Sequence, residues 1–202
     1  MRLFHFTSAT HGLSAIRDQR LKVATIRDLN DPFELLSSDL PDANARRAFQ
    51  AFKLQTANRF GLLCFSKFWR NPLQWSHYAD KHKGIALEFE VADDSVQKVR
   101  YVTQRVPFNY ADIVAAGGFS EEDAERIFTT KSHHWSYERE YRVAVDLEDC
   151  VVESNLRFFD FSSRLVLRGV VLGAACRDLS ENIEKATPYG MQLHVRKARL
   201  AF

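Results

Sequence analysis

The order of the apolar segments is the feature that most constrains the fold of this chain. Strand-like and helix-like segments are mixed in the first half, and the second half is rich in strand candidates that a helix from Ser180 interrupts. A regular strand–helix alternation would predict a parallel sheet, and strands alone would predict an all-β fold. Neither pattern is present, so we expect an α+β domain with mostly antiparallel or mixed sheets.

Local patterns place the individual elements. Short apolar runs predict strands, and amphipathic spacing behind a capping residue predicts helices. Strands are expected at Arg2–Phe6, Leu21–Ile26, Gly61–Phe65, Gly84–Glu90, Glu140–Leu147, Val151–Glu153, Leu156–Phe161, Leu165–Leu172 and Met191–Leu200, with an extended segment at Val99–Phe108. Helices are expected after Ser8, over Asp42–Arg59, through Trp75 and Tyr78, and after the cap Ser120.

Length and composition favour one ordinary globular domain that spans residues 1–202. The chain has 202 residues, 46% of them hydrophobic and 27% charged, without repeats or linkers, which excludes a disordered or collagen-like chain. Its net charge of +2 provides no overall field for nucleic acid or a membrane surface, although a local basic groove is compatible with it.

The cysteines and the apolar runs bear on the compartment. Three cysteines, Cys64, Cys150 and Cys176, are too few and odd in number for a disulfide framework. No run is long enough for a signal peptide or a membrane span. We therefore predict a soluble protein of the reducing cytoplasm, with no membrane partner.

Familiar catalytic motifs are missing. The sequence has no glycine-rich nucleotide loop, no H-E-x-x-H, no G-x-S-x-G and no deaminase signature. His77 and His82 are spaced awkwardly for one helical face, and the neighbours His133 and His134 would point apart in a strand. We therefore predict no metal site.

Three clusters of polar and aromatic residues remain. His5-Phe6-Thr7-Ser8 and Trp75-Ser76-His77-Tyr78 carry hydrogen-bonding groups, but a histidine in an apolar strand and aromatics on a helix are more often structural. The third cluster is Trp135–Arg142. If it is a strand, Glu138, Glu140 and Arg142 share one face, which is either a charged edge or a polar cleft, and the two carboxylates raise one another's pKa.

Two short segments have the form of helix starts. In Asn30-Asp31-Pro32-Phe33-Glu34, Asp31 can cap a helix that begins at Pro32, and Asn71-Pro72-Leu73-Gln74 follows the same logic. Helix initiation explains both segments. The alternative is that their free N–H groups bind an anion.

The order of five motifs resembles a widespread bacterial family, domain-of-unknown-function family 2971. The motifs extend across nearly the whole chain. They are L-x-H-[FY]-T-S (Leu3–Ser8), L-N-D-P-x-E (Leu29–Glu34), C-F-S (Cys64–Ser66), W-x-H-Y-x-D-x-H-K-G (Trp75–Gly84) and W-x-x-E-x-E-Y-R (Trp135–Arg142), and Val170–Gly173 also fits. The family name supplies no activity.

A second, more distant resemblance suggests an activity. An early strand histidine, a middle tyrosine and a glutamate that opens a late strand are similar to the His-Tyr-Glu triad of the ADP-ribosyltransferase fold. His5, Tyr78 and Glu140 take these places, and Glu138 completes an E-x-E pair. The resemblance implies a split β-sandwich flanked by helices, with NAD as the substrate.

Two features leave this assignment open in detail. Phe6 stands where the polymerase-like branch has a small glycine, which would crowd the nicotinamide. Tyr101 and Tyr110 are further candidates for the middle tyrosine.

The resemblance also implies roles. Glu140 would stabilise the positive charge that develops on the ribose, and Glu138 would orient or deprotonate the acceptor. His5 would bind the adenosine ribose, Thr7 or Ser8 the nicotinamide amide, and Tyr78 the ring. The residues expected to contact NAD are His5, Thr7, Ser8, Asn30, Asp31, Trp75, Tyr78 and Arg142, and Lys83 and Asn71 are further candidates for the diphosphate.

The acceptor of ADP-ribose, whether protein, nucleic acid or water, stays open. The resemblance implies a toxin or a phage-defence effector, with which an antitoxin could pair. One alternative is a noncatalytic nucleotide-binding or interaction module. Another is a metal-dependent nuclease that uses Glu138, Glu140, Asp31 and a histidine.

Overall fold

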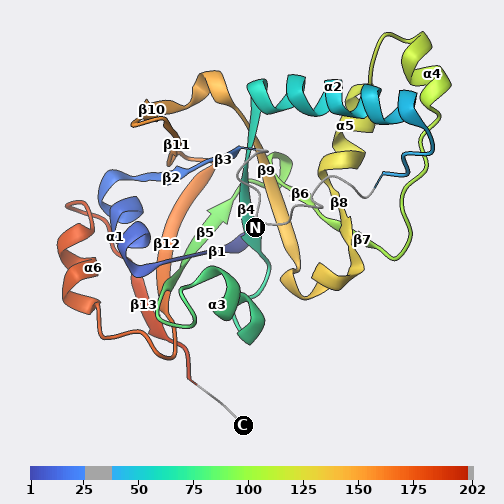
Figure 1. The fold of residues 1–202 in the computed structure, drawn as a ribbon. Helices are drawn as coiled ribbons and strands as arrows, with labels where there is room; N and C mark the ends of the chain where they lie inside the picture. Colours follow the sequence, from blue (N-terminus) through green and yellow to red (C-terminus); the bar gives the residue numbers. More distant parts are fainter. Residues whose placement is uncertain (26–37, 200–202) are drawn as a thin grey trace.

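A mixed eight-stranded sheet forms the centre of the computed structural model, which describes residues 1–25 and 38–199 (Figure 1). In this part of the chain the strand order is β13-β12-β5-β1-β4-β9-β6, and β3 pairs with β4. The strands are β1 (Arg2–Thr7), β3 (Ala24–Thr25), β4 (Phe60–Ser66), β5 (Ile85–Val91), β6 (Gln97–Lys98), β9 (Glu140–Asp146), β12 (Leu165–Leu172) and β13 (His194–Lys197). All neighbours are antiparallel except β12 and β13, so the α+β expectation is confirmed.

The sheet divides between β1 and β4. β1 pairs with β5 at six positions, whereas it pairs with β4 only at Phe4 and Ser66. Beyond that pair a side chain replaces the backbone hydrogen bonds between the two strands. The Nδ1–H of His5 donates to the carbonyl oxygen of Cys64 at 3.0 Å. The two halves of the sheet therefore diverge from Phe4 onward and leave room for side chains between them.

A second, three-stranded sheet packs on one face of the main sheet. It is made of β10 (Val151–Glu153), β11 (Leu156–Asp160) and β2 (Arg20–Lys22). Helices α1 (Ala9–Asp18) and α6 (Ser180–Ala186) complete this layer. The core between them contains buried Leu21, Leu87 and Phe89, each of which contributes about 1.5–3 kcal/mol by leaving water.

Helix α3 (Pro72–Tyr78) covers the other face near β1. Pro72 stands in the first turn, and Asn71 caps the helix by accepting a hydrogen bond from the backbone N–H of Leu73 at 2.9 Å. Trp75 is 3% exposed and packs with Phe4. This packing fixes α3 beside the point where the sheet divides.

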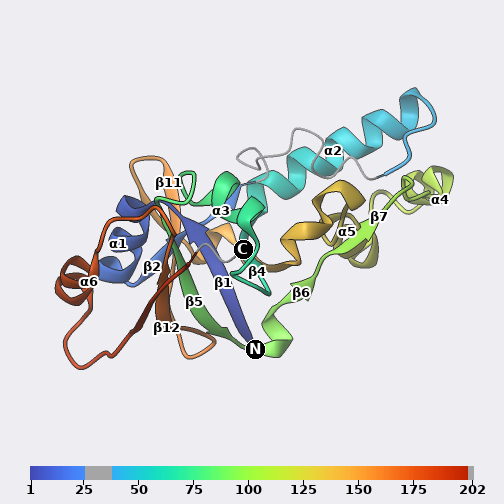
Figure 2. The same ribbon diagram turned by 90° about the horizontal axis from the view of Figure 1, so that it is seen from below.

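A helical lobe extends from the sheet beyond its end strand β6 (Figure 2). It contains α2 (Ala43–Arg59), α4 (Tyr110–Ala115) and α5 (Glu121–Phe128), and phenylalanines of α2, of α5 and of the connecting segments form a separate cluster around Phe49. The parallel strands β7 (Arg100–Val102) and β8 (Thr130–Ser132) connect the lobe to the sheet. Three short 3-10 helices lie at Asp93–Ser95, His133–Glu138 and Leu147–Asp149.

Two expected strands and one expected extended segment contain strands that are shorter than the ranges named from the sequence. Leu21–Ile26 is interrupted at Val23, whose N–H bonds Arg157, because β2 belongs to the small sheet and β3 to the main sheet. In the segment Val99–Phe108 the strand is Arg100–Val102, and in the described part of Met191–Leu200, which ends at residue 199, the strand is His194–Lys197. The expected helix start at Asn30-Asp31 lies outside the described residues.

Candidate active site

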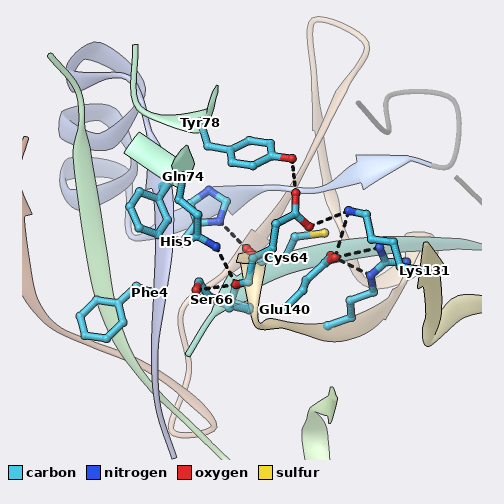
Figure 3. Close-up of a pocket in the computed structure, with 12 residues that line it drawn as sticks. Phe4, His5, Cys64, Ser66, Gln74, Tyr78, Lys131 and Glu140 are labelled. Atoms are coloured by element: carbon cyan, nitrogen blue, oxygen red, sulfur yellow. Dashed lines mark hydrogen bonds and ion pairs between the residues drawn. The ribbon is translucent and has the colours of Figure 1, made fainter. Parts of the chain in front are cut away.

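A cavity of about 150 Å³ occupies the divide between β1 and β4 (Figure 3). Strands β1, β4, β8 and β9, helix α3 and the end of the 3-10 helix His133–Glu138 supply its walls. The lining residues are Phe4, His5, Phe6, Cys64, Phe65, Ser66, Gln74, Tyr78, Lys131, Glu138, Glu140 and Arg142. Segments that are far apart in the sequence thus meet at one polar site.

The segment before β9 differs from the expected strand. Glu138 ends the 3-10 helix, Arg139 has a positive φ of 47°, and the strand begins only at Glu140. The prediction that Glu138 shares a strand face with Glu140 is therefore wrong. The turn nevertheless brings both carboxylates to the same cavity, because the reversal at Arg139 returns the chain toward β4.

Backbone contacts hold Glu138 in this position. Its carbonyl oxygen accepts hydrogen bonds from Ser66 Oγ at 2.7 Å and from Gln74 Nε2 at 2.6 Å. Asn71 Nδ2 donates to the carbonyl of Tyr137 at 3.0 Å. Since these donors come from β4 and from the start of α3, the turn is fixed on two sides.

Both carboxylates are bonded to the same lysine. Lys131 Nζ lies 2.8 Å from Glu138 Oε2 and 3.2 Å from Glu140 Oε2. The Tyr78 hydroxyl donates to Glu138 Oε1 at 2.5 Å. Arg142 donates to Glu140 through Nε at 2.7 Å and Nη2 at 3.0 Å. Two cations thus balance two anions in a buried cluster.

The two carboxylates have opposite pKa shifts. Burial raises the pKa of Glu138, the charge of Lys131 opposes this, and the charge of Glu140 adds to it. For Glu140, burial would raise the pKa, but Arg142 and Lys131 outweigh it and lower the pKa to about 2. One carboxylate is therefore held ionised, and the other is the group that gains a proton more readily.

The neighbouring groups are held uncharged. Burial lowers the pKa of His5, and the hydrogen bond to Cys64 opposes it only in part, so the imidazole stays neutral near pH 7. Burial also raises the pKa of Tyr101, whose hydroxyl accepts a hydrogen bond from the Glu140 backbone N–H at 2.8 Å. The site's charge therefore resides in the lysine, arginine and glutamate cluster.

The structure brings together five of the residues that the sequence singled out. His5, Tyr78, Glu138, Glu140 and Arg142 all line the cavity. The polar-cleft interpretation of the Glu-Glu-Arg pattern therefore describes the site better than the charged-edge interpretation.

The other singled-out residues lie elsewhere. Trp75 is in the core behind the cavity and donates to the carbonyl of Trp69 at 2.5 Å. Ser8 caps α1, and Thr7 lines a second cavity of about 320 Å³ on the side of α1, with His5 between the two cavities. Lys83 is exposed in the turn after α3. Asn30 and Asp31 are outside the described residues.

Sequence patterns did not single out Lys131 or Gln74. Lys131 is 7% exposed, lies on a strand that pairs with β7, and contacts both glutamates. Gln74 is 3% exposed and directs its amide nitrogen to Glu138. The only signal was the short distance in sequence between Lys131 and the two glutamates.

No cluster for a metal ion emerges from the described residues, where no group of three or more His, Cys, Asp or Glu side chains is placed to hold one. The three cysteines are free thiols. Within the same residues, no helix combines the length and the apolar character that a membrane span requires.

Fold and cavity together define an α+β protein with a buried carboxylate pair in a divided sheet. Residues 74–143 match the model of a family described as protein of unknown function (DUF2971), which confirms the resemblance over that segment. The matched segment contains Tyr78, Lys131, Glu138 and Glu140. No curated protein and no solved structure matches the chain.

Proposed function

We propose that the cavity cleaves the nicotinamide–ribose bond of NAD, as an ADP-ribosyltransferase or an NAD glycohydrolase. The observation that carries the proposal is the pair Glu138 and Glu140 at the floor of the cavity, with the pKa of one raised and that of the other lowered to about 2. Groups with separated pKa values suit separate roles in one reaction.

Cleavage of a glycosidic bond develops positive charge on the ribose. Glu140 is ionised throughout the physiological pH range, so its fixed negative charge favours that transition state over the uncharged ribose of the ground state. Lys131 and Arg142 reduce this charge, and their contacts also fix its position. Tyr78 and His5 line the cavity where a ring and a ribose would bind.

Glu138 is the candidate base. In hydrolysis a water oxygen would form the new bond to the ribose carbon while nicotinamide leaves with the electron pair of the broken bond, and Glu138 would take the proton of the water. With another acceptor, Glu138 would take that acceptor's proton. A raised pKa suits a group that must accept and then release a proton near neutral pH.

The diphosphate contacts stay a prediction. Arg142 is 2% exposed and is engaged with Glu140 and with the carbonyl of Phe128 at 2.8 Å, which is the geometry of an anchor for the carboxylate. Asn71 is engaged as a helix cap. Substitution of exposed Lys83 by Ala, with NAD affinity as the readout, tests the remaining candidate.

Nicotinamide release from NAD by the purified protein tests the proposal. Glu140→Gln should lower the rate of nicotinamide release at least about a hundredfold. The affinity for NAD, measured by calorimetry, should stay within a few-fold of the wild-type value. Glu90→Gln is the matched control, because that exposed glutamate pairs with Arg168 on the sheet surface. Equal release by wild type and Glu140→Gln would contradict the assignment.

The release assay is run with and without cell extract. Release by the protein alone supports the glycohydrolase form, and release only with extract supports transfer to an acceptor. The toxin or phage-defence role is tested by expression in bacteria: growth inhibition by the wild type and its loss in Glu140→Gln are expected. No release in either condition, with NAD still bound, would favour the noncatalytic nucleotide-binding module.

A further inference from the structure

Two segments form the surface beside the cavity mouth. The chain from Ser66 to Ala79 packs against the chain from Ser132 to Arg139, and side-chain and backbone donors of the first segment bond to backbone carbonyl groups of the second. Lys67 N–H donates to the carbonyl of Arg139 at 3.1 Å, next to the bonds that Glu138 and Tyr137 receive. Because these bonds use carbonyl groups of the second segment, its aromatic side chains Trp135 and Tyr137 take no part in them.

Three aromatic rings gather on this surface, which we call the aromatic rim: His77, Trp135 and Tyr137. Their ring centroids lie 6.0 to 6.4 Å apart, and the His77 and Tyr137 planes differ by 32°. His77 is exposed, and Trp135 and Tyr137 are half-buried. His77 neighbours Tyr78, whose hydroxyl bonds Glu138, so the rim is continuous with the cavity.

The exposed charged side chains within these two segments are all basic. Arg70 in the first segment and Arg139 in the second are both exposed. Residues 66–79 contain no Asp or Glu, and in residues 129–139 the single acid is Glu138, which is 4% exposed. This basic surface stands out from a chain of net charge +2. The chemistry that complements it is an aromatic ring joined to an anion.

We infer that the aromatic rim binds a single-stranded nucleic acid, whose bases stack on the rings while its phosphates face Arg70 and Arg139. Unpaired bases stack on aromatic side chains without regard to sequence, and arginine supplies the electrostatic attraction. This part of the inference rests on the proposed function: the bound nucleic acid is the acceptor of ADP-ribose. A base nitrogen or sugar hydroxyl forms the new bond to the ribose carbon as nicotinamide leaves, and the proton of that group passes to Glu138.

Fluorescence anisotropy with labelled dT12 and rU12 tests the binding, and the two oligonucleotides distinguish DNA from RNA. Trp135→Ala should weaken binding about tenfold by removing one stacking platform. Arg139→Ala should weaken it severalfold and reduce its salt dependence. Arg164→Ala is the control, because Arg164 is an exposed arginine that lies away from α3. Its neighbour Leu165 pairs with Val91, at the far end of β5.

Three outcomes would overturn the inference: no binding of either oligonucleotide, equal effects of the rim and control variants, or equal binding of a polyglutamate peptide that Trp135→Ala leaves unchanged. The last result would show a merely electrostatic surface that also accepts acidic proteins. Binding that depends on Trp135, in a protein that releases no nicotinamide, would support the rim while contradicting the proposed function.

Discussion

Lys131 Nζ lies 2.8 Å from Oε2 of Glu138, inside a cluster where both side chains are less than a tenth exposed. The same ammonium contacts Glu140 and lies 5.1 Å from the centre of the Trp135 ring. One lysine thus connects the two carboxylates with the aromatic rim. Because the two glutamates repel one another, the geometry of the cavity floor depends on this cation.

Lys131→Met should destabilise the protein by about 3–5 kcal/mol, since it leaves two buried carboxylates with one cation fewer. Urea unfolding followed by circular dichroism measures the change. The control is Lys185→Met, which removes an exposed pair with Glu181 and should cost less than about 1 kcal/mol. Similar losses in both variants would show that the buried cluster contributes little.

Glu140 should make stability depend on acid pH. Its pKa falls from the ordinary 4.5 to about 2 on folding, so its contribution is fully present above about pH 5 and is lost as the pH falls through about 2. The linked free energy is about 3 kcal/mol. In urea unfolding between pH 6 and 2, Glu140→Gln should flatten the dependence of the unfolding free energy on pH, and Glu90→Gln should leave that dependence unchanged. A profile of unchanged slope in Glu140→Gln would contradict the lowered pKa.

Glu138 contributes to the pH dependence of stability with the opposite sign. Its pKa is raised on folding, so the folded protein binds this proton more tightly than the unfolded chain does, and protonation of Glu138 favours the folded state. A carboxyl-carbon NMR titration should show the midpoint of Glu138 above 4.5 in the wild type, and higher still in Lys131→Met. A midpoint at or below the ordinary value in the wild type would refute the assignment.

Tyr78→Phe should keep the fold and lose about 1 kcal/mol of stability, because one hydrogen bond to a carboxylate disappears. Since that bond favours the ionised form of Glu138, its loss should move the acidic limb of nicotinamide release to higher pH. Tyr189→Phe, a fully exposed tyrosine, is the control. A loss of rate with no movement of the acidic limb would separate Tyr78 from Glu138.

Gly84→Ala should destabilise the protein by at least about 2 kcal/mol and displace α3 from β1. A Cβ there would lie 2.2 Å from the backbone oxygen of Thr7 and 2.8 Å from the Ala79 backbone, and neither can move without moving its element. Thermal unfolding measures the loss, and exposed Ser76→Ala serves as the control. Unchanged stability of Gly84→Ala would show that α3 adjusts freely.

Much of the fold could be predicted from local signals. The caps Ser8 and Ser120 and the apolar spacing of Asp42–Arg59 predicted helix starts that the structure shows, because these signals come from residues close in sequence. The apolar runs of β4 and β5 were likewise located to within a residue or two.

The features of the fold and the site that could not be predicted depend on contacts between segments distant in sequence. The cavity requires Lys131 on β8, a strand that pairs with the distant β7. Glu138 reaches them through a reversal at Arg139, a residue type with no preference for positive φ. Periodicity along the sequence contains neither piece of information, so the two carboxylates were predicted to be neighbours for the wrong reason.

The cavity exists because backbone pairing stops. Phe4 and Ser66 form the single rung between β1 and β4, and each further rung would draw the strands to the usual separation of about 5 Å, too close for a ring or a sugar to enter. The width of the opening is therefore set by where pairing ends. Substitutions that lengthen the β1–β4 ladder would seal the cavity even if every side chain in it were retained.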